Sequence, residues 1–220
     1  MSSNAEFGCL VIIGPPTSGK SSIARQITEQ HPHIQLVRGK DILPEQTGKY
    51  EPKRELIPDK IFIPALINLL NQKSGHLILD NIPRTLKQTK KLLNWALSTH
   101  HAITVANLIL TETQVVSRSQ GREVCPTCER SYHPQLLPSP TPGFCPHDKS
   151  PLTIRPGDAE NIVRQGYRHH LKMDNPILFD FKNQGIPIID IDANTTVDQT
   201  RQRLITSLVS NPAICHILTG

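Results

Sequence analysis

The sequence predicts an α/β domain in which a doubly wound parallel sheet of five strands is flanked by helices. Three observations support this fold. Short apolar runs alternate with longer helical patterns, the runs are continuously apolar like strands buried on both faces, and 220 residues fit one domain. The predicted strands are residues 9–13, 35–37, 76–79, 103–110 and 186–191. The predicted helices are residues 21–29, 59–71, 86–96, 113–119, 159–172 and 197–209.

Two polar segments interrupt this alternation. Residues 38–57 hold two prolines and two glycines, and residues 121–158 hold eight prolines beside a cluster of cysteines. Long irregular segments inside a compact domain are usually lids or binding loops. We therefore expect one domain over residues 1–220 with two insertions, a small lobe at 39–69 and a lid at 121–158.

Composition excludes several classes of protein. Hydrophobic residues make up 37% and charged residues 20%, which is enough to build a core and excludes a disordered chain. No apolar run approaches the roughly 20 residues of a membrane span, and residues 1–8 lack the features of a secretory signal. We expect a cytoplasmic monomer without a membrane partner. We also expect no nucleic-acid partner, because aromatic residues are only 4% and the lid holds few cations. The net charge of +5 suits an anionic ligand.

The first predicted strand leads directly into a glycine-rich motif. The segment Gly14-Pro15-Pro16-Thr17-Ser18-Gly19-Lys20-Ser21 fits G-x-x-x-x-G-K-[ST], with a strand before it and a helix after it. Backbone N–H groups and the positive end of the helix bind phosphate, Lys20 contacts the outer phosphates, and the Ser21 hydroxyl approaches Mg²⁺. The alternative is a glycine turn with a chance Lys-Ser, which the context disfavours. The motif predicts binding of ATP or GTP through Gly14, Thr17, Ser18, Gly19, Lys20, Ser21 and Ser22.

The cysteines of the lid form a metal-ligand pattern. Cys125-Pro-Thr-Cys128 and Cys145-Pro-His-Asp148 repeat one spacing, with the two halves separated as in C-x2-C-x16-C-x2-D. Such paired turns place four ligands around Zn²⁺. Symmetry favours Asp148 as the fourth ligand, although His147 and His133 are rivals. We expect a structural zinc site, the alternative being a loop of free thiols.

These motifs together resemble those of the adenylate kinase family over about residues 11–204. Asp80-Asn81-Ile82-Pro83-Arg84-Thr85 with Gln88 is similar to the segment D-G-F-P-R-T-x-x-Q of that family. Residues 121–133 and the cysteine spacing resemble its zinc-bearing lid. Residues 152–158, with Val163 and Arg164, resemble the return from that lid into the next helix.

The resemblance implies a nucleoside monophosphate kinase, most simply one that converts ATP and AMP to two ADP with Mg²⁺. Because the acceptor phosphate is already anionic, such a reaction needs convergent cations rather than a general base. The implied catalytic cations are Lys20, Arg84, Arg122, Arg155 and Arg164.

The resemblance also implies binding roles on both sides of the site. On the ATP side it adds Arg118, which would stack on adenine, together with Arg122 and Tyr132. Asp80 would hold Mg²⁺ through water, unless it only caps its strand, and isolated arginines could equally be surface charges. The implied acceptor residues are Gly39, Ile57, Asn81, Arg84, Gln88 and Arg155.

The sequence departs from the family on the acceptor side. Where the family has T-G-D-M-L-R, this chain has Gly39-Lys40-Asp41-Ile42-Leu43-Pro44, and Gly166 stands where V-R-x-R-L has its second arginine. Three explanations stay open: other cations substitute, the acceptor is not AMP, or the chain binds ATP and zinc with weak or no transfer. The candidate substitutes are Arg38, Lys40, Arg54 and Arg168. The pairs His100–His101 and His169–His170 lack metal-ligand partners and are interpreted as surface residues.

Overall fold

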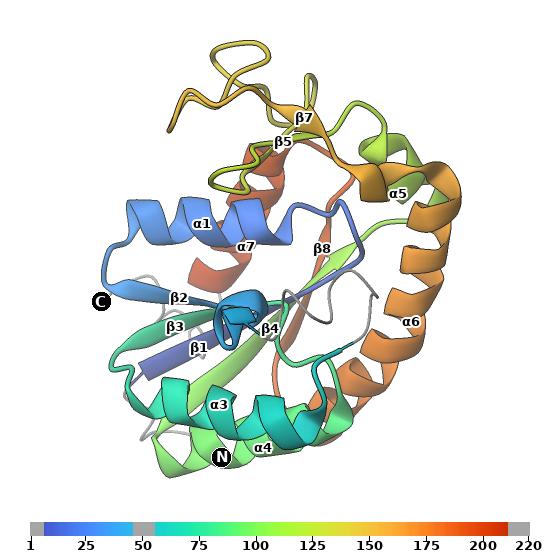
Figure 1. Cartoon of the computed structure of the whole chain (residues 1–220). Helices are drawn as coiled ribbons and strands as arrows, with labels where there is room; N and C mark the ends of the chain where they lie inside the picture. The colour runs from blue at the N-terminus through green and yellow to red at the C-terminus, as the bar shows by residue number, and fades with distance from the viewer. Residues whose placement is uncertain (1–6, 46–55, 211–220) are drawn as a thin grey trace.

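Five parallel strands form the central sheet of the protein in the order β2-β3-β1-β4-β8 (Figure 1). The computed structural model describes residues 7–45 and 56–210. The strands are β1 (Phe7–Ile13), β2 (Ile34–Arg38), β3 (His76–Asp80), β4 (His101–Ile109) and β8 (Ile188–Asp192). The predicted fold class is confirmed, and every predicted strand lies in this sheet.

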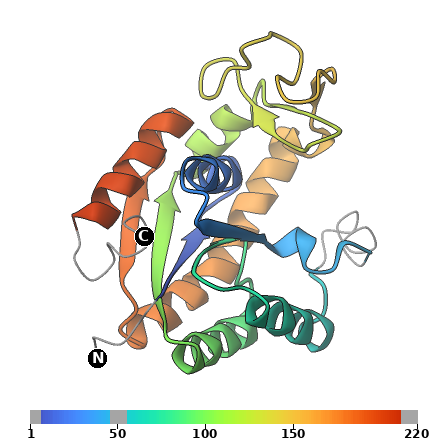
Figure 2. The ribbon, with the colours of Figure 1, turned by 90° about the vertical axis from the view of Figure 1, so that its left-hand side faces the viewer.

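Helices cover both faces of the sheet. Alternate residues of β1 divide the core: Leu10 and Ile12 face α1 and α7, whereas Val11 faces α3, α4 and α6. Figures 1 and 2 show these two helical layers on opposite sides of the strands. The helices are α1 (Lys20–Gln30), α3 (Asp59–Asn71), α4 (Leu86–Ser98), α5 (Glu112–Ser119), α6 (Glu160–Asn183) and α7 (Val197–Val209).

One predicted helix boundary is wrong. The helix expected to end at residue 172 continues through Pro176 to Asn183 as α6. A proline removes one backbone hydrogen bond, but Ile177 and Phe181 extend the apolar face and are fully buried against the sheet. Tertiary packing therefore outweighs the local cost of the proline.

The segments that follow α5 and β2 depart from the central sheet. The cysteine-bearing insertion forms a small antiparallel sheet of β5 (Glu123–Val124), β6 (Ser131–Tyr132) and β7 (Thr153–Ile154), followed by the short helix η3 (Pro156–Asp158). Strands of two residues are too short to leave a periodic pattern in the sequence. The other insertion begins with η1 (Gly39–Asp41), which projects from the end of β2 (Figure 2). Within the described ranges, no helix is both long and apolar enough to cross a membrane.

Candidate active site

The glycine-rich motif forms a loop between β1 and α1 whose backbone is partly left-handed. Gly19 has φ 89° at the start of α1, and Thr17 has φ 62°, a conformation that costs a non-glycine residue about 1–2 kcal/mol. Thr17 is held there from α5: its hydroxyl donates to Val115 O (3.2 Å) and its carbonyl accepts from Arg118 Nε (3.0 Å). Gly14 is required by close packing, because a Cβ there would lie 2.8 Å from Leu108 Cβ.

Lys20 folds back over this loop. Its ammonium donates to the carbonyls of Gly14 (2.6 Å) and Pro15 (2.8 Å). Burial lowers the pKa of Lys20 to about 8, while the carboxylates of Asp80 and Asp174 oppose that shift. The loop therefore holds a poorly solvated cation that a phosphate group would stabilise.

Asp80 ends β3 beside Lys20. It is 3% exposed, and within the described part of the chain its Oδ1 has no hydrogen-bond partner. Buried polar atoms are normally satisfied, so an orphaned carboxylate oxygen that faces a cavity marks a place for a ligand. Oxygen is the donor type that Mg²⁺ prefers, and the Ser21 hydroxyl lines the same cavity. These residues fit a Mg²⁺ ion that arrives with a nucleotide.

Two cavities meet at Lys20. We call the first the lid cavity; it has a volume of about 520 Å³ and lies between the glycine-rich loop, η1 and the cysteine insertion. We call the second the α6 cavity; it has a volume of about 830 Å³ and lies between the same loop, α3, α4 and α6. Both are open to solvent at the carboxyl ends of the strands, where parallel α/β sheets bind ligands.

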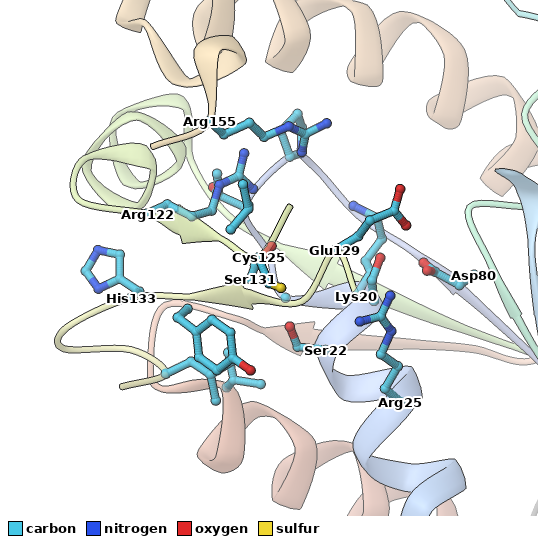
Figure 3. A pocket seen from close by; sticks show the side chains of 18 of the residues that line it. Lys20, Ser22, Arg25, Asp80, Arg122, Cys125, Glu129, Ser131, His133 and Arg155 are labelled. Atoms are coloured by element: carbon cyan, nitrogen blue, oxygen red, sulfur yellow. The ribbon is translucent and has the colours of Figure 1, made fainter. Parts of the chain in front are cut away.

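Arginines enter these cavities from the insertion. Figure 3 shows Arg122 and Arg155 reaching in from the lid side, opposite Lys20 and Asp80. Arg122 is paired with the buried carboxylate of Asp158, to which its Nε donates at 2.7 Å. Arg164 lies outside both cavities, where its guanidinium contacts Glu160 and Glu112 on α6 and α5.

The α6 cavity has a different lining. Arg84 follows β3 and is largely buried, which lowers its pKa, while Asp174 opposes that shift. Gln88 is 2% exposed and uses its amide within the protein: Oε1 accepts from Arg84 N–H (2.8 Å) and Nε2 donates to Asp59 (2.9 Å). On α6, Asp174 pairs with His170 at 2.8 Å.

The cysteine insertion is built from two copies of one turn. Cys125 N–H donates to Arg130 O and Glu129 N–H to Cys125 O, and the same two bonds recur from Cys145 to Ser150 and from Lys149 to Cys145. Glu129 and Lys149 both take left-handed backbone conformations, with φ 59° and 64°. The repeated C-P-x-[C/D] spacing of the sequence therefore corresponds to a repeated fold.

These two turns bring four metal-ligating side chains together. Ligand atoms of Cys125, Cys128, Cys145 and Asp148 all lie within 4.8 Å of one another, and Cys128 Sγ is 3.5 Å from Cys145 Sγ. Tetrahedral zinc with bonds of about 2.3 Å separates its sulfur ligands by about 3.8 Å, so the spacing fits zinc. Asp148, rather than His147 or His133, completes the cluster among the described residues.

The structure brings most of the predicted site residues to the cavities. All six predicted acceptor residues line the α6 cavity. Ser18 lines neither cavity; it is buried behind the loop. Arg54 lies outside the described residues. The predicted ATP-side residues that line the lid cavity are Thr17, Gly19, Lys20, Ser21, Ser22, Arg118, Arg122 and Tyr132, and Gly14 lines the α6 cavity.

Several lining residues escaped the sequence reasoning. His169 and His170 line the α6 cavity; His169 is exposed, as expected, whereas the His170 side chain is 13% exposed and pairs with Asp174, so its interpretation as a surface residue is wrong. Asp174 lines it too, and Glu129 lines the lid cavity. The i, i+4 spacing of His170 and Asp174 places both on one face of a helix. The sequence could not indicate this, because the predicted helix ends at residue 172 whereas α6 continues to Asn183.

A glycine-rich phosphate loop on a parallel sheet, with convergent cations at the carboxyl ends of its strands, defines a P-loop phosphotransferase. Comparison with known proteins narrows this class. The adenylate kinase of Thermococcus onnurineus (strain NA1) is 32% identical over 205 residues, covering 89% of this chain and 91% of that protein. That of Pyrococcus abyssi (strain GE5 / Orsay) is 31% identical, covering 89% and 93%. The adenylate kinase of Clostridium novyi (strain NT) is 28% identical, covering 86% and 93%.

No protein-family model matches the chain. The similarity to the relatives nevertheless extends over nearly the whole chain and nearly the whole of each relative. The protein belongs to the adenylate kinase family, and it is therefore a nucleoside monophosphate kinase, a phosphotransferase.

Proposed function

We propose that this protein transfers a phosphoryl group from ATP directly to AMP, forming two ADP. The observation that carries this proposal is the junction of two cavities at Lys20, each large enough for a nucleotide. A donor in the lid cavity and an acceptor in the α6 cavity would meet at the glycine-rich loop. Direct transfer requires this proximity, and the reaction gains most of its rate from alignment and charge neutralisation.

The lid cavity suits ATP. Lys20 and the N–H groups of the loop would bind its outer phosphates, and Arg118 offers a guanidinium plane to the base. Arg118 is already fixed by bonds to the carbonyls of Thr17 and Thr195 (3.0 and 2.7 Å), so it can present that plane without a loss of side-chain entropy. Mg²⁺, when bound, would neutralise phosphate charge beside Asp80 and Ser21.

The α6 cavity suits a nucleoside monophosphate. Arg84 would bind the acceptor phosphate, and its guanidinium, unlike a lysine, offers two parallel donors to it. Gln88 retains one N–H and one lone pair for the acceptor base after its bonds to Arg84 and Asp59. Arg122 and Arg155 line both cavities and would contact the transferred group from the lid side.

The lid and its metal have a structural role in this proposal. Apart from the cysteines, the apolar core of the insertion contains only Tyr132 and Leu152, which is too small to hold a fold by itself. Zinc bound by Cys125, Cys128, Cys145 and Asp148 would connect the two turns and keep Arg122 and Arg155 above the cavities. The lobe at residues 39–69 and the lid at residues 121–158 would close together over the substrates and exclude water.

A second candidate is transfer to an acceptor other than AMP. It is favoured by the lining of the α6 cavity, where Gly166 offers no side chain and Asp174 brings a negative charge. Because every nucleoside monophosphate carries the same phosphate charge, this lining would distinguish acceptors only through the base and sugar. The two candidates share a donor site and differ only in which monophosphate is used.

A coupled assay of ADP formation with ATP and a panel of AMP, GMP, CMP, UMP and deoxynucleoside monophosphates tests both candidates. We expect two ADP for each ATP consumed with AMP, and no product from ATP alone. Lys20→Met protein, purified in parallel, controls for contaminating kinase. A preference for another monophosphate would favour the second candidate, and absence of turnover with every acceptor would refute both.

Metal analysis tests the zinc site separately. We expect one zinc per chain, and we expect Asp148→Ala to lower its content and to increase proteolytic cleavage within residues 121–158. His147→Ala is the matched control, because His147 neighbours the cluster but contributes no ligand. A metal-free protein whose lid resists proteolysis as well as the wild type does would contradict the assignment.

A further inference from the structure

The junction of the two cavities carries one cation that neither the motif nor the resemblance assigns. Four of the residues that line both cavities are cationic, and among the described residues that line both there is no carboxylate. A phosphoryl group that passes from donor to acceptor must cross this junction. The shared lining residues are Pro16, Thr17, Lys20, Gly39, Lys40, Asn81, Arg122 and Arg155.

This cation is Lys40, to which neither the glycine-rich motif nor the family resemblance gives a role. It lies on η1, directly after Gly39, and lines both cavities. The α6 cavity needs a further positive charge, since Arg84 is its one Lys or Arg outside the junction in the described chain, and Asp174 opposes it. Among the other candidate substitutes in the described ranges, Arg38 lines the lid cavity but not the α6 cavity, and Arg168 lies outside both cavities with 72% of its side chain exposed.

Lys40 forms an ion pair with Glu129 of the lid. The pair joins the two insertions across the mouth of the lid cavity, and the Glu129 side chain is 59% exposed. Figure 3 shows Glu129 entering the cavity above Lys20 and Asp80. Glu129 also holds a left-handed φ of 59°, which a glycine would adopt at lower cost. Because Lys149 takes the same conformation in the other turn, it is the position of the Glu129 charge in the lid cavity, and not its backbone, that points to a function.

We infer that Lys40 binds the phosphate at the junction and that Glu129 holds Lys40 until substrates arrive. This inference rests on the proposed function, because it assumes that donor and acceptor phosphates meet at Lys20. Exposed ion pairs contribute little free energy, whereas an ammonium close to several phosphate charges gains a stronger, charge-assisted bond. The exchange of Glu129 for phosphate is therefore favourable. Once Lys40 leaves it, the unpaired Glu129 carboxylate would repel nucleotide phosphates, although its 59% exposed side chain can remain solvated.

Binding of a dinucleotide in which five phosphates join two adenosines tests the inference without requiring turnover. Titration calorimetry with this probe should show Lys40→Met binding roughly 10- to 100-fold more weakly than the wild type. ATP alone should lose much less affinity, because it does not fill the junction. Lys40→Arg should keep most of the affinity for the dinucleotide. Lys60→Met is the matched control, since Lys60 is exposed on α3 and lines neither cavity.

Glu129→Gln tests the holding role. It should tighten binding of the dinucleotide by roughly two- to fivefold, because Lys40 loses its ion pair with Glu129 and a repulsive charge is removed. Glu29→Gln is its control: it breaks the Arg130–Glu29 pair, which also joins lid to core but involves no cation of the junction. Weaker binding of the dinucleotide by Glu129→Gln would overturn the holding role.

Parallel transfer assays separate this inference from the proposed function. If the wild type forms ADP from ATP and AMP while Lys40→Met binds the dinucleotide like the wild type, the inference fails and the proposed function survives. If Lys40→Met weakens the dinucleotide while the wild type transfers nothing, the proposed function fails and Lys40 remains a phosphate-binding residue. A wild type that does not bind the dinucleotide overturns the inference.

Discussion

The lid cavity and the α6 cavity share the residues of the junction but differ in the charged residues that line the rest of each. Beyond the junction, the lid cavity holds Arg25, Arg38 and Arg118, and its orphaned Asp80 oxygen suits a metal that accompanies ATP. Among the described residues, Arg84 is the one arginine or lysine that the α6 cavity adds, and it is opposed by Asp174. The phosphate-binding loop at the junction is a contiguous motif, whereas Arg84 and Asp174 of the α6 cavity lie far apart in the sequence. A donor site of this kind is therefore easier to infer than an acceptor site.

Lys20→Met should have the largest effect, because Lys20 lines both cavities. We expect phosphoryl transfer to fall by roughly 10³-fold, as on removal of a preorganised electrostatic group. Steady-state kinetics with both substrates varied provide the measurement, and Lys60→Met should match the wild type. A variant impaired only toward the acceptor would show that Lys20 belongs to one cavity alone.

Arg84→Met should separate the two cavities. We expect kcat/KM for the acceptor to fall by roughly 10²-fold, because a bidentate contact with its phosphate is lost. The Kd for ATP, measured by calorimetry, should stay within about twofold of the wild type. Arg203→Met, which removes an exposed arginine paired with Asp192, is the control. Equal losses of ATP and acceptor affinity would contradict the division into donor and acceptor cavities.

The sequence could group the residues of the proposed donor side because their determinants are local. The glycine-rich motif runs without interruption between a strand and a helix, and the repeated cysteine spacing reappears as two turns with the same hydrogen bonds. Asp80 was predictable as the end of a buried strand. In each case neighbouring residues in the chain are also neighbours in space.

The acceptor side could not be predicted as fully because its determinants are not local. Asp174 and His170 reach the α6 cavity only because α6 continues through Pro176, a result of packing that no local pattern reveals. The pairing of Lys40 with Glu129 joins segments of different insertions. Arg164 carries the expected charge at the expected position, but Glu112 and Glu160 hold it outside the cavities.

Gly166→Arg should sharpen the comparison by adding the charge that the α6 cavity lacks. A Cβ at Gly166 would lie 3.5 Å from Pro16 Cγ, an ordinary contact, so the position accepts a side chain. If AMP is the acceptor, its KM should fall by roughly tenfold, as one charge-assisted bond provides. Asn161→Arg, on an exposed position of α6, should leave KM unchanged. An unchanged or higher KM in Gly166→Arg would favour a different acceptor.

The smallest predicted effect is the pH dependence of ATP binding. Burial lowers the pKa of Lys20 to about 8 in the free protein, and phosphate would raise it again. Between these two pKa values binding takes up a proton, so affinity falls as pH rises through 8. We expect roughly a twofold loss between pH 7 and pH 8. Calorimetry in two buffers of different ionisation enthalpy measures the proton uptake, which should vanish in Lys20→Met.

A crystal structure with the dinucleotide of two adenosines and five phosphates tests the central claim most directly. The account predicts one adenosine beside Arg118 in the lid cavity, the other beside Arg84 in the α6 cavity, and the phosphates passing Lys20 between them. The account would be contradicted if either cavity held no adenosine, or if the phosphates did not contact Lys20.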